Sequence, residues 1–300
     1  MKRKLWLLLA GASLVCLCGA TGLTVVGRWS FLRRQPPAVA NQTLFAGVVY
    51  TREVRSSPRP LVVHVVTVDL RQPGVSLLVT PGNPDGERSL RAQTTSAFLE
   101  RHGLQLAVNG DGFTPWYSAS LLRYYPHVGD PVDPLGFAAS QGKIYAQGNG
   151  VAPTLYISRN NRARFNLPIG AVYNAISGNL MLVAAGKPLP EALLAEVAGV
   201  LQPRTALALD KSGRKLIIVV VDGRQPGYSE GATLPELAEI IIAHGGFYAM
   251  NMDGGGSSAL VMADKNGKAR LLNSPIDQNI PGRERVVGNH LGVYAAPAGD

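Results

Sequence analysis

Cysteine is nearly absent from this 300-residue chain, and its absence removes several kinds of chemistry. The two cysteines, Cys16 and Cys18, lie inside an apolar N-terminal segment, where a small hydrophobic role fits them best. The rest of the chain therefore has no disulfide, no thiol nucleophile and no cysteine metal site. We expect its stability to come from a hydrophobic core, which about 260 residues can supply.

Acidic residues are missing from residues 1–40, which hold six of the nine excess positive charges. Within them, Leu5 to Gly27 carries no charge and is long enough to span a bilayer, with the basic residues 2–4 on the cytoplasmic side. We expect residues 1–32 to be a signal anchor or, alternatively, a cleaved signal peptide, followed by a linker at 33–43. The domain at 44–300 is then predicted to lie outside the cytoplasm, anchored to the membrane or secreted.

Histidine is also scarce, and the chain after residue 40 carries little net positive charge. The five histidines show no metal-ligand spacing, so no cofactor is expected, although a divalent cation among loop carboxylates stays open. After the first forty residues only three of the nine excess positive charges remain. No basic helix with interleaved aromatic residues is present either, which argues against a nucleic acid partner.

What the sequence does contain is many short β-type runs and about three helix patterns. We expect helices near 94–103, 190–200 and 233–244, the last begun by a capping box of Thr233 and Glu236. A strand at 61–70 is expected to pair with one at 75–80. This pattern predicts one α+β domain with mixed or antiparallel sheets.

Three loops combine acids or amides with glycine at the ends of apolar strands: Asn109–Phe113, Asp222–Gly231 and Asn251–Ser258. If their strands are neighbours that run in the same sense, the loops converge on one edge. Three consecutive glycines, Gly254 to Gly256, exceed what a hairpin turn needs, so we expect a close approach to the backbone there. The loop is expected to enter a strand at 259–263 and not a helix.

These loops would bring Asp253 and Asp222 together, with Asp111 and Glu230 as further carboxylates. Pairs of carboxylates serve glycoside cleavage, whereas arginines such as Arg204 with backbone N–H groups suit a phosphate. A site that holds both suits a sugar joined to a phosphate. A separate aromatic loop could stack on a sugar or pack on the core, and its rings are those of Trp116, Tyr117, Tyr124 and Tyr125.

Four motifs occur in order: Pro203-Arg204-Thr205, Asp222-Gly223-Arg224, Thr233-Leu234-x-Glu236, and Asn251-x-Asp253 followed by Gly-Gly-Gly-Ser. This ordered set resembles the phosphodiester glycosidase family. The resemblance implies a hydrolase acting on a glycosyl phosphodiester, with Asp253 and Asp222 as motif acids. It also implies a set of substrate-binding positions, namely Asn109, Arg204, Thr205, Arg224, Asn251, Gly254, Gly255, Gly256, Ser257 and Arg285.

We therefore predict an exported hydrolase that cleaves the glycosidic bond of a glycosyl phosphodiester in an envelope polysaccharide or glycoconjugate. Its N-terminal segment would make the membrane its second partner. Two alternatives stay open. One is a non-catalytic envelope module that binds polysaccharide, and the other is a metal-dependent phosphodiesterase that cleaves the P–O bond.

Overall fold

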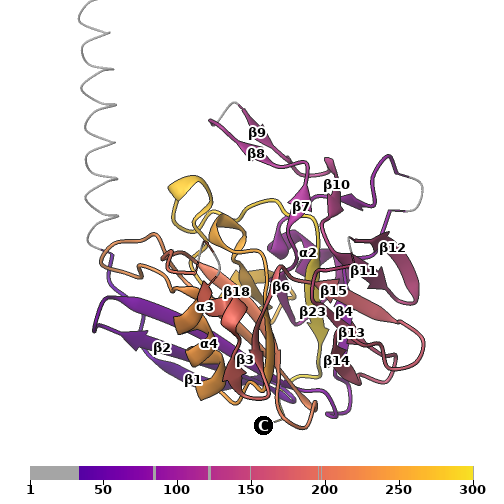
Figure 1. The fold of residues 1–300 in the computed structure, drawn as a ribbon, viewed down its shortest axis with the longest axis horizontal. Helices are drawn as coiled ribbons and strands as arrows, with labels where there is room; N and C mark the ends of the chain where they lie inside the picture. Colours follow the sequence, from indigo (N-terminus) through magenta and orange to yellow (C-terminus); the bar gives the residue numbers. More distant parts are fainter. Residues whose placement is uncertain are drawn as a thin grey trace, which may run out of the picture.

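The computed structural model describes residues 34–299 apart from 84–85, 121–122, 149, 195 and 197 (Figure 1). The predicted anchor at 1–32 lies outside these residues. Among the helices that are described, none is long and apolar enough to cross a bilayer.

The largest sheet has eight strands in the order β1-β2-β3-β19-β18-β20-β16-β17, and each neighbouring pair in it is antiparallel. Valine and isoleucine dominate its centre, where β-branched side chains pack well on a pleated surface. Its strands are β1 (Ala40–Phe45), β2 (Val48–Arg55), β3 (Leu61–Asp69), β19 (Lys215–Val221), β18 (Arg204–Leu209), β20 (Tyr248–Asn251), β16 (Leu180–Ala184) and β17 (Lys187–Pro188).

Two five-stranded sheets and two small ones complete the β structure. The first five-stranded sheet contains β22 (Ala269–Leu271), β21 (Leu260–Ala263), β6 (Leu106–Asn109), β23 (His290–Tyr294) and β4 (Ser76–Val79). The second contains β12 (Lys143–Gln147), β11 (Phe137–Ser140), β15 (Asn174–Ser177), β13 (Thr154–Ile157) and β14 (Ala163–Phe165). The small sheets are β5 (Leu90–Arg91), β10 (Pro131–Pro134) and β7 (Phe113–Thr114), and the projecting hairpin β8 (Tyr117–Ser118) with β9 (Tyr124–Tyr125).

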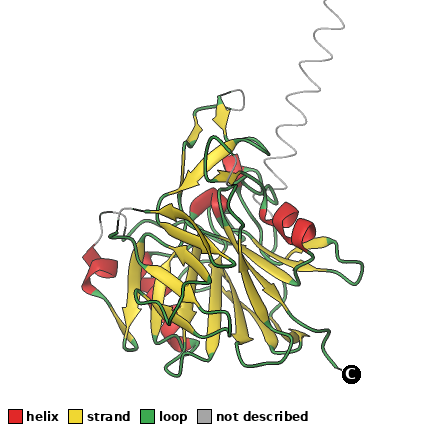
Figure 2. Cartoon of the chain, turned by 90° about the vertical axis from the view of Figure 1, so that its right-hand side faces the viewer, coloured by secondary structure: helices red, strands yellow, loops and turns green. Residues whose placement is uncertain are grey.

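The three α-helices of the described chain lie on the outside of the sheets (Figure 2). They are α2 (Thr95–His102), α3 (Pro190–Leu194) and α4 (Leu234–Ala243). Helix α4 begins with the expected capping box, in which Thr233 and Glu236 satisfy each other's backbone N–H groups. Helix α2 is capped by Thr94 and ends at Gly103 in a left-handed conformation.

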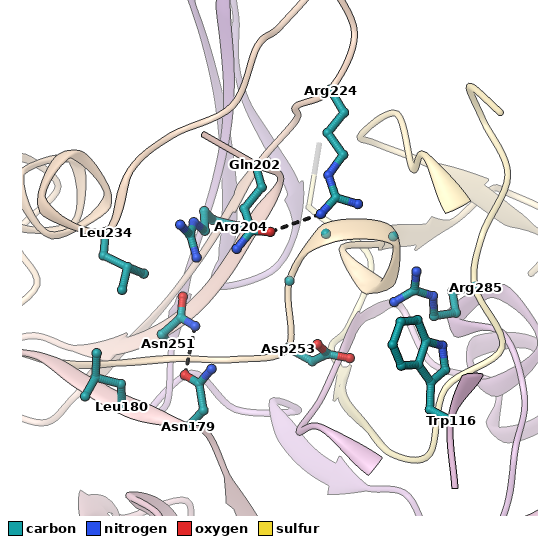
Figure 3. A pocket seen from close by; sticks show the side chains of 13 residues that line it. Trp116, Asn179, Leu180, Gln202, Arg204, Arg224, Leu234, Asn251, Asp253 and Arg285 are labelled. Atoms are coloured by element: carbon teal, nitrogen blue, oxygen red, sulfur yellow. Dashed lines mark hydrogen bonds between the residues drawn. The ribbon is translucent and has the colours of Figure 1, made fainter. Parts of the chain in front are cut away.

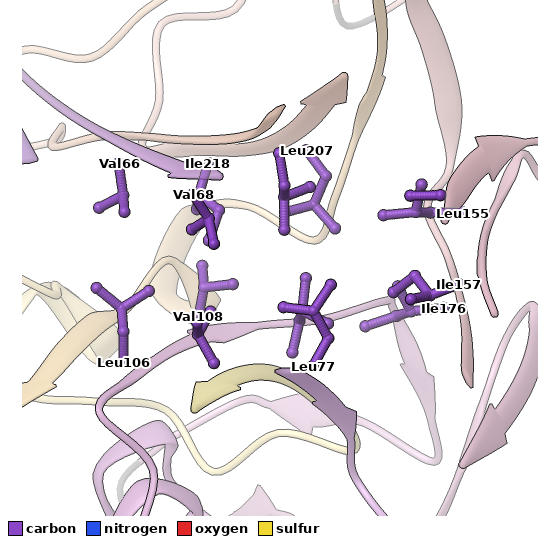
Figure 4. Packing of buried hydrophobic residues seen from close by; sticks show 14 of the residues in the cluster. Val66, Val68, Leu77, Leu106, Val108, Leu155, Ile157, Ile176, Leu207 and Ile218 are labelled. Carbon is purple, nitrogen blue, oxygen red and sulfur yellow. The ribbon is translucent and has the colours of Figure 1, made fainter. Parts of the chain in front are cut away.

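The core is layered. Helices α3 and α4 cover one face of the eight-stranded sheet, around Leu237 and Ile241. The other face packs on the β4-β6-β21-β23 sheet, as Figure 4 shows for Val66 and Ile218 opposite Leu106 and Val108. Helix α2 closes the outer side of that second sheet. The result is a sandwich of two sheets between helical layers, a standard way to bury one apolar face of each element.

The α+β prediction is confirmed in its main part, because the sheets are mostly antiparallel and the helices are few and short. One pairing was wrong: the strand β4 pairs with β23 in the second sheet and not with β3. Helix α3 is also shorter than the pattern at 190–200 predicted. Strand β1 begins at Ala40, within the segment expected to be a linker.

Candidate active site

A cavity of about 400 Å³ opens where the central strands of the eight-stranded sheet end. Strands β19 and β20 are both antiparallel to β18, which lies between them, so they run in the same sense and end at this cavity. Strand β18 starts there with Arg204. The cavity is lined by Trp116, Asn179, Leu180, Gln202, Arg204, Arg224, Leu234, Asn251, Asp253, Gly254, Gly255, Gly256 and Arg285 (Figure 3).

The loop that follows β20 forms the floor of the cavity. It contains a turn of 3-10 helix, η1 (Gly255–Ser257), and then enters strand β21, so the prediction that a strand and not an α-helix follows the loop is confirmed. A Cβ on Gly256 would overlap the side chains of Arg285 and Asp277. At Gly255, where φ is +61°, a Cβ would lie 3.1 Å from Arg224 Nη2. The glycines therefore let two guanidinium groups approach the backbone from either side.

Asp253 stands at the start of this turn and is half-buried. Its carboxylate accepts hydrogen bonds from the Ser257 hydroxyl and the Gly254 N–H, and it feels the positive charge of Arg285. Burial raises the pKa of Asp253 and outweighs these three opposing influences. A carboxylate with a raised pKa at the wall of a cavity is suited to accepting or donating a proton.

Asn109 and Thr205, two predicted substrate-binding residues, hold the Asp253 loop from behind. Asn109 Nδ2 donates to the Asp253 carbonyl oxygen over 2.8 Å, and the Asp253 N–H donates to the Gly110 carbonyl oxygen over 3.1 Å. The Thr205 hydroxyl donates to Asn109 Oδ1 over 2.9 Å. Both side chains are fully buried, and neither lines the cavity.

Three arginines reach the cavity from different segments. Arg224 donates from Nη2 to Gln202 Oε1 over 3.0 Å, and Arg204 donates to the carbonyl oxygens of Val200 and Ala232. Burial and the nearby charge of Arg224 lower the pKa of Arg204 to about 10. Burial and the charge of Arg285 likewise lower the pKa of Arg224. Like charges gathered at a partly buried site favour the binding of an anion.

Arg285 comes from the polar loop before β23. Its Nε donates to Asp277 Oδ1 over 2.8 Å, and Nη1 donates to the Ser257 hydroxyl over 3.2 Å. The guanidinium carbon lies 4.8 Å from the ring centre of Trp116, an exposed residue of the aromatic loop. A cation over an indole ring is a favourable contact. Arg285 is therefore fixed in direction and still faces the cavity.

Asp222, the second predicted catalytic acid, is placed elsewhere. It is fully buried behind the cavity, does not line it, and its Oδ2 lies 3.0 Å from His64 Nε2 and 3.1 Å from the Tyr228 hydroxyl. Its Oδ1 accepts from the Asn273 side chain and the Ser274 N–H. Burial alone would raise the pKa of Asp222, but His64 and these hydrogen bonds outweigh it and lower that pKa. His64, which lies on β3, is the partner of this acid.

Asp111 is the carboxyl group that interacts electrostatically with Asp253. It is buried, and its Oδ2 accepts a 2.6 Å hydrogen bond from the Gly136 N–H. Burial raises its pKa to about 7, and the negative charge of Asp253 acts in the same direction. Two carboxyl groups that oppose each other's ionisation are the usual components of acid–base chemistry.

Asn251 ends β20 and brings an amide to the cavity. Its Nδ2 donates to Asn179 Oδ1 over 2.8 Å, whereas its Oδ1 is buried and has no hydrogen-bond partner among the described residues. A buried acceptor without a partner costs free energy until a ligand supplies a donor. The described chain contains no group of three or more His, Cys, Asp or Glu side chains placed to hold a metal ion.

A family model for phosphodiester glycosidases matches residues 102–294. The chain belongs to the phosphodiester glycosidase family. A search of curated proteins gave no match. Among solved structures, the catalytic domain of zebrafish N-acetylglucosamine-1-phosphodiester alpha-N-acetylglucosaminidase, auto-inhibited by its pro-peptide, is similar at 22% identity and a TM-score of 0.59, covering 88% of this chain and 85% of that one.

Two bacterial structures share the fold as well. A hypothetical protein from Synechocystis matches at 16% identity with a TM-score of 0.60, over 86% of this chain and 64% of that one, so this chain spans less than two thirds of that protein. A Burkholderia pseudomallei protein described as exported matches at 17% identity with a TM-score of 0.57, over 80% of this chain and 75% of that one. At such identities these likenesses concern the fold.

The family motifs contain most of the residues that line the cavity, but not all of them. Asn179, Leu180 and Gln202 line the cavity and were not predicted. They lie outside the acid-and-glycine loops, and an asparagine after a glycine or a glutamine before a proline is common in any turn. Only the pairing of β16 with β20 brings Asn179 beside Asn251.

Proposed function

We propose that this member of the phosphodiester glycosidase family is an exported hydrolase that cleaves the glycosidic bond of a glycosyl phosphodiester in an envelope polysaccharide or glycoconjugate. One observation carries the proposal: a single cavity holds the Asp253 carboxylate together with three arginines whose charges repel one another. A phosphate relieves that repulsion, and the carboxylate faces the sugar that the phosphate carries.

The phosphate binds above the triple-glycine turn, between Arg224 and Arg285. When the bond between the anomeric carbon and the phosphate oxygen breaks, its electron pair stays on that oxygen and the phosphate gains a negative charge. Guanidinium groups already in place stabilise this charge without having to reorganise. The leaving phosphate monoester is a weak base, so it departs with little need for a proton.

The sugar lies on the amide side of the cavity, where Asn251 and Asn179 can bond its hydroxyl groups. Asp253 accepts a proton from the water that attacks the anomeric carbon, and the products are the free sugar and a phosphate monoester. Asp111, whose pKa the charge of Asp253 raises further, is the second carboxyl group of the proposed site. Asp222 supports the loop of Arg224 from behind and acts as a positioning residue.

Export is part of the proposal. The apolar run at 5–27 and the basic residues before it support a membrane anchor, with secretion after cleavage as the alternative. Arg34, at the start of the described chain, lies 4.1 Å from the Tyr228 ring and donates to Gln225, the neighbour of Arg224. The chain therefore enters the domain close to the cavity, and an anchored protein would hold its cavity near the membrane.

The decisive experiment is hydrolysis of a panel of glycosyl phosphodiesters in water enriched in ¹⁸O, with and without a chelator. Cleavage at the anomeric carbon places the label in the released sugar. Label in the phosphate, with loss of turnover in chelator, would instead establish the metal-dependent phosphodiesterase. Binding of the substrates without any product, at high protein concentration, would establish the non-catalytic module.

A further inference from the structure

A second cavity, of about 550 Å³, adjoins the first. The two share Asn179 and Leu180 in their walls, so they lie next to each other. The second cavity is further lined by Phe137, Gln147, Gly150, Val151, Thr154, Tyr156, Asn166, Met181 and Glu191, among others. Both volumes lie within the range of small-molecule sites, and neither cavity is explained by the packing of the core.

The floor of the second cavity is the outer face of the β12-β11-β15-β13-β14 sheet. Along β13, Leu155 and Ile157 point into the core, so the alternation of a strand turns Thr154 and Tyr156 outward. The ring of Tyr156 lies 5.6 Å from that of Phe137 on β11, at 45° to it. Two half-buried aromatic rings thus form an apolar platform with a polar edge, which suits the apolar C–H face of a sugar ring.

The two cavities differ in charge. Three arginines line the first, whereas Glu191 is the charged residue among those that line the second. Amide and hydroxyl groups make up most of its polar lining, from Gln147, Thr154, Asn166 and Asn179. No lysine or arginine is among the described residues that line this cavity, although the exposed Arg164 lies across from Tyr156 on the neighbouring strand β14. The lining itself therefore fits an uncharged chain.

Figure 3 shows which end of the first cavity the second one adjoins. Asp253 stands between the amides Asn251 and Asn179 on one side and the pair Arg285 and Trp116 on the other. The second cavity adjoins the first at Asn179 and Leu180, on the side of Asn251 and Arg204, and not at Arg285 and Trp116.

We propose, on the basis of the function given above, that the sugar which loses its phosphate is the end of a longer neutral glycan. The preceding sugar residues of that glycan lie in the second cavity and stack on Tyr156 and Phe137. The substrate class is then an oligosaccharyl or polysaccharyl phosphodiester with an unphosphorylated chain, rather than a single sugar on a phosphodiester.

The first test compares substrates that share one phosphodiester group and carry one, two or four neutral sugars. We expect kcat/KM to rise about 10-fold from one sugar to four, the gain of one good aromatic contact. Tyr156→Ala should reduce that ratio to near one. Tyr173→Ala is the matched control, because Tyr173 is also half-buried near this sheet but lines neither cavity, and it should keep the wild-type ratio.

The second test needs no turnover. Phosphate-free tetrasaccharides of glucose and of N-acetylglucosamine are titrated into the full chain by calorimetry, and we expect one of them to bind the wild type and Tyr173→Ala but not Tyr156→Ala. Equal turnover of all chain lengths, together with no tetrasaccharide binding, would overturn the inference and leave the proposed function intact. Tetrasaccharide binding without turnover of any phosphodiester would overturn the proposed function alone.

Discussion

The side-chain amide of Asn109 donates a 2.8 Å hydrogen bond to the backbone carbonyl of Asp253, 144 residues further along the chain. Asn109 ends β6 in one sheet, and Asp253 follows β20 in the other. A second bond runs from the Asp253 N–H to the Gly110 carbonyl oxygen. Together the two bonds connect the Asp253 loop to the other sheet of the sandwich. The position of the carboxylate therefore depends on both sheets.

Asn109→Ala removes this tie, so the Asp253 carbonyl and the Ala259 N–H lose their bonds to Asn109. The Thr205 hydroxyl then keeps only its contact with Ser258. We expect the free energy of unfolding to fall by about 1–3 kcal/mol, because buried polar groups lose their hydrogen bonds. Turnover at saturating substrate should fall as well, since Asp253 is no longer held. Urea unfolding and initial rates measure the two effects. Full turnover in a destabilised variant would show that Asn109 serves the fold alone.

Asp253→Asn keeps the shape of the side chain and removes its ability to take a proton. We expect turnover to fall by about 10²–10⁴-fold, the usual contribution of a positioned general base. The melting temperature should not decrease, because the raised pKa shows that the carboxylate ionises at a cost in the folded state. Unchanged turnover of a phosphodiester would remove Asp253 from the mechanism.

Arg224→Gln separates binding from stability. The positive charge of Arg285 lowers the pKa of Arg224, so this substitution should raise the melting temperature of the ligand-free protein while it raises KM for a phosphodiester. Inorganic phosphate should stabilise the wild type more than the variant in thermal unfolding. Arg164→Gln, an exposed arginine outside both cavities, is the control. Equal stabilisation of all three proteins would contradict a phosphate site at Arg224.

Asp222→Asn tests whether the buried acid is structural. The amide cannot carry the negative charge that faces His64 Nε2, whereas His64 Nδ1 keeps its bond to the Tyr50 hydroxyl, so we expect a loss of about 1–3 kcal/mol in the free energy of unfolding. The double variant with His64→Gln should lose less than the sum of the single variants. Turnover per folded molecule should stay within a few-fold of the wild type. Its complete loss in a folded protein would restore Asp222 as a catalytic acid.

Asp111 should make stability depend on pH. Its folded-state pKa of about 7 exceeds the ordinary 3.8, so the folded state binds more protons than the unfolded state between these values. Stability should therefore fall as pH rises from about 4 to 7, by up to 1.4 kcal/mol per pH unit, and level off above. Asp111→Asn should flatten that slope, as read from urea unfolding at pH 5 to 8.

The exposed Asp264 is the control for Asp111, because its pKa is shifted in the opposite direction. Hydrogen bonds from the N–H groups of Lys268 and Asn266 lower its pKa, so its contribution is present above the ordinary value and lost only in more acidic solution. Asp264→Asn should leave the slope between pH 5 and 8 unchanged. A slope that survives Asp111→Asn would assign the effect to Asp253 or Glu284, whose raised pKa values act in the same direction.

Local signals in the sequence were enough for the helices and the floor of the cavity. The capping box at Thr233, the glycine run after Asp253 and the strand-like valine runs each act over a few residues, and each is confirmed in the structure. The order of the strands depends on contacts between distant segments, so β4 was assigned to the wrong sheet. Sequence spacing does not encode which strands become neighbours.

Contacts between distant segments also decide how Asp222 and Asp253 differ. Asp222 and Asp253 both follow apolar strands that run in the same sense, and sequence alone treats them as equivalent. Burial separates them, because His64 from β3 pairs with Asp222 inside the core, whereas Arg285 and Ser257 meet Asp253 at the cavity. The sequence predicts Asp111 as a further carboxylate of these loops, but it could not show that burial raises its pKa, with a smaller contribution from the charge of Asp253.

The three glycines of the Asp253 loop also set how the site can change over time. A side chain at Gly256 would overlap Arg285 and Asp277, and one at Gly255 would crowd Arg224 in a backbone conformation that favours glycine. Substitutions at exposed positions of the adjoining cavity, such as Gln147 and Glu191, change its lining without touching the turn. We therefore expect glycan preference to change more readily through that cavity than through the glycine turn.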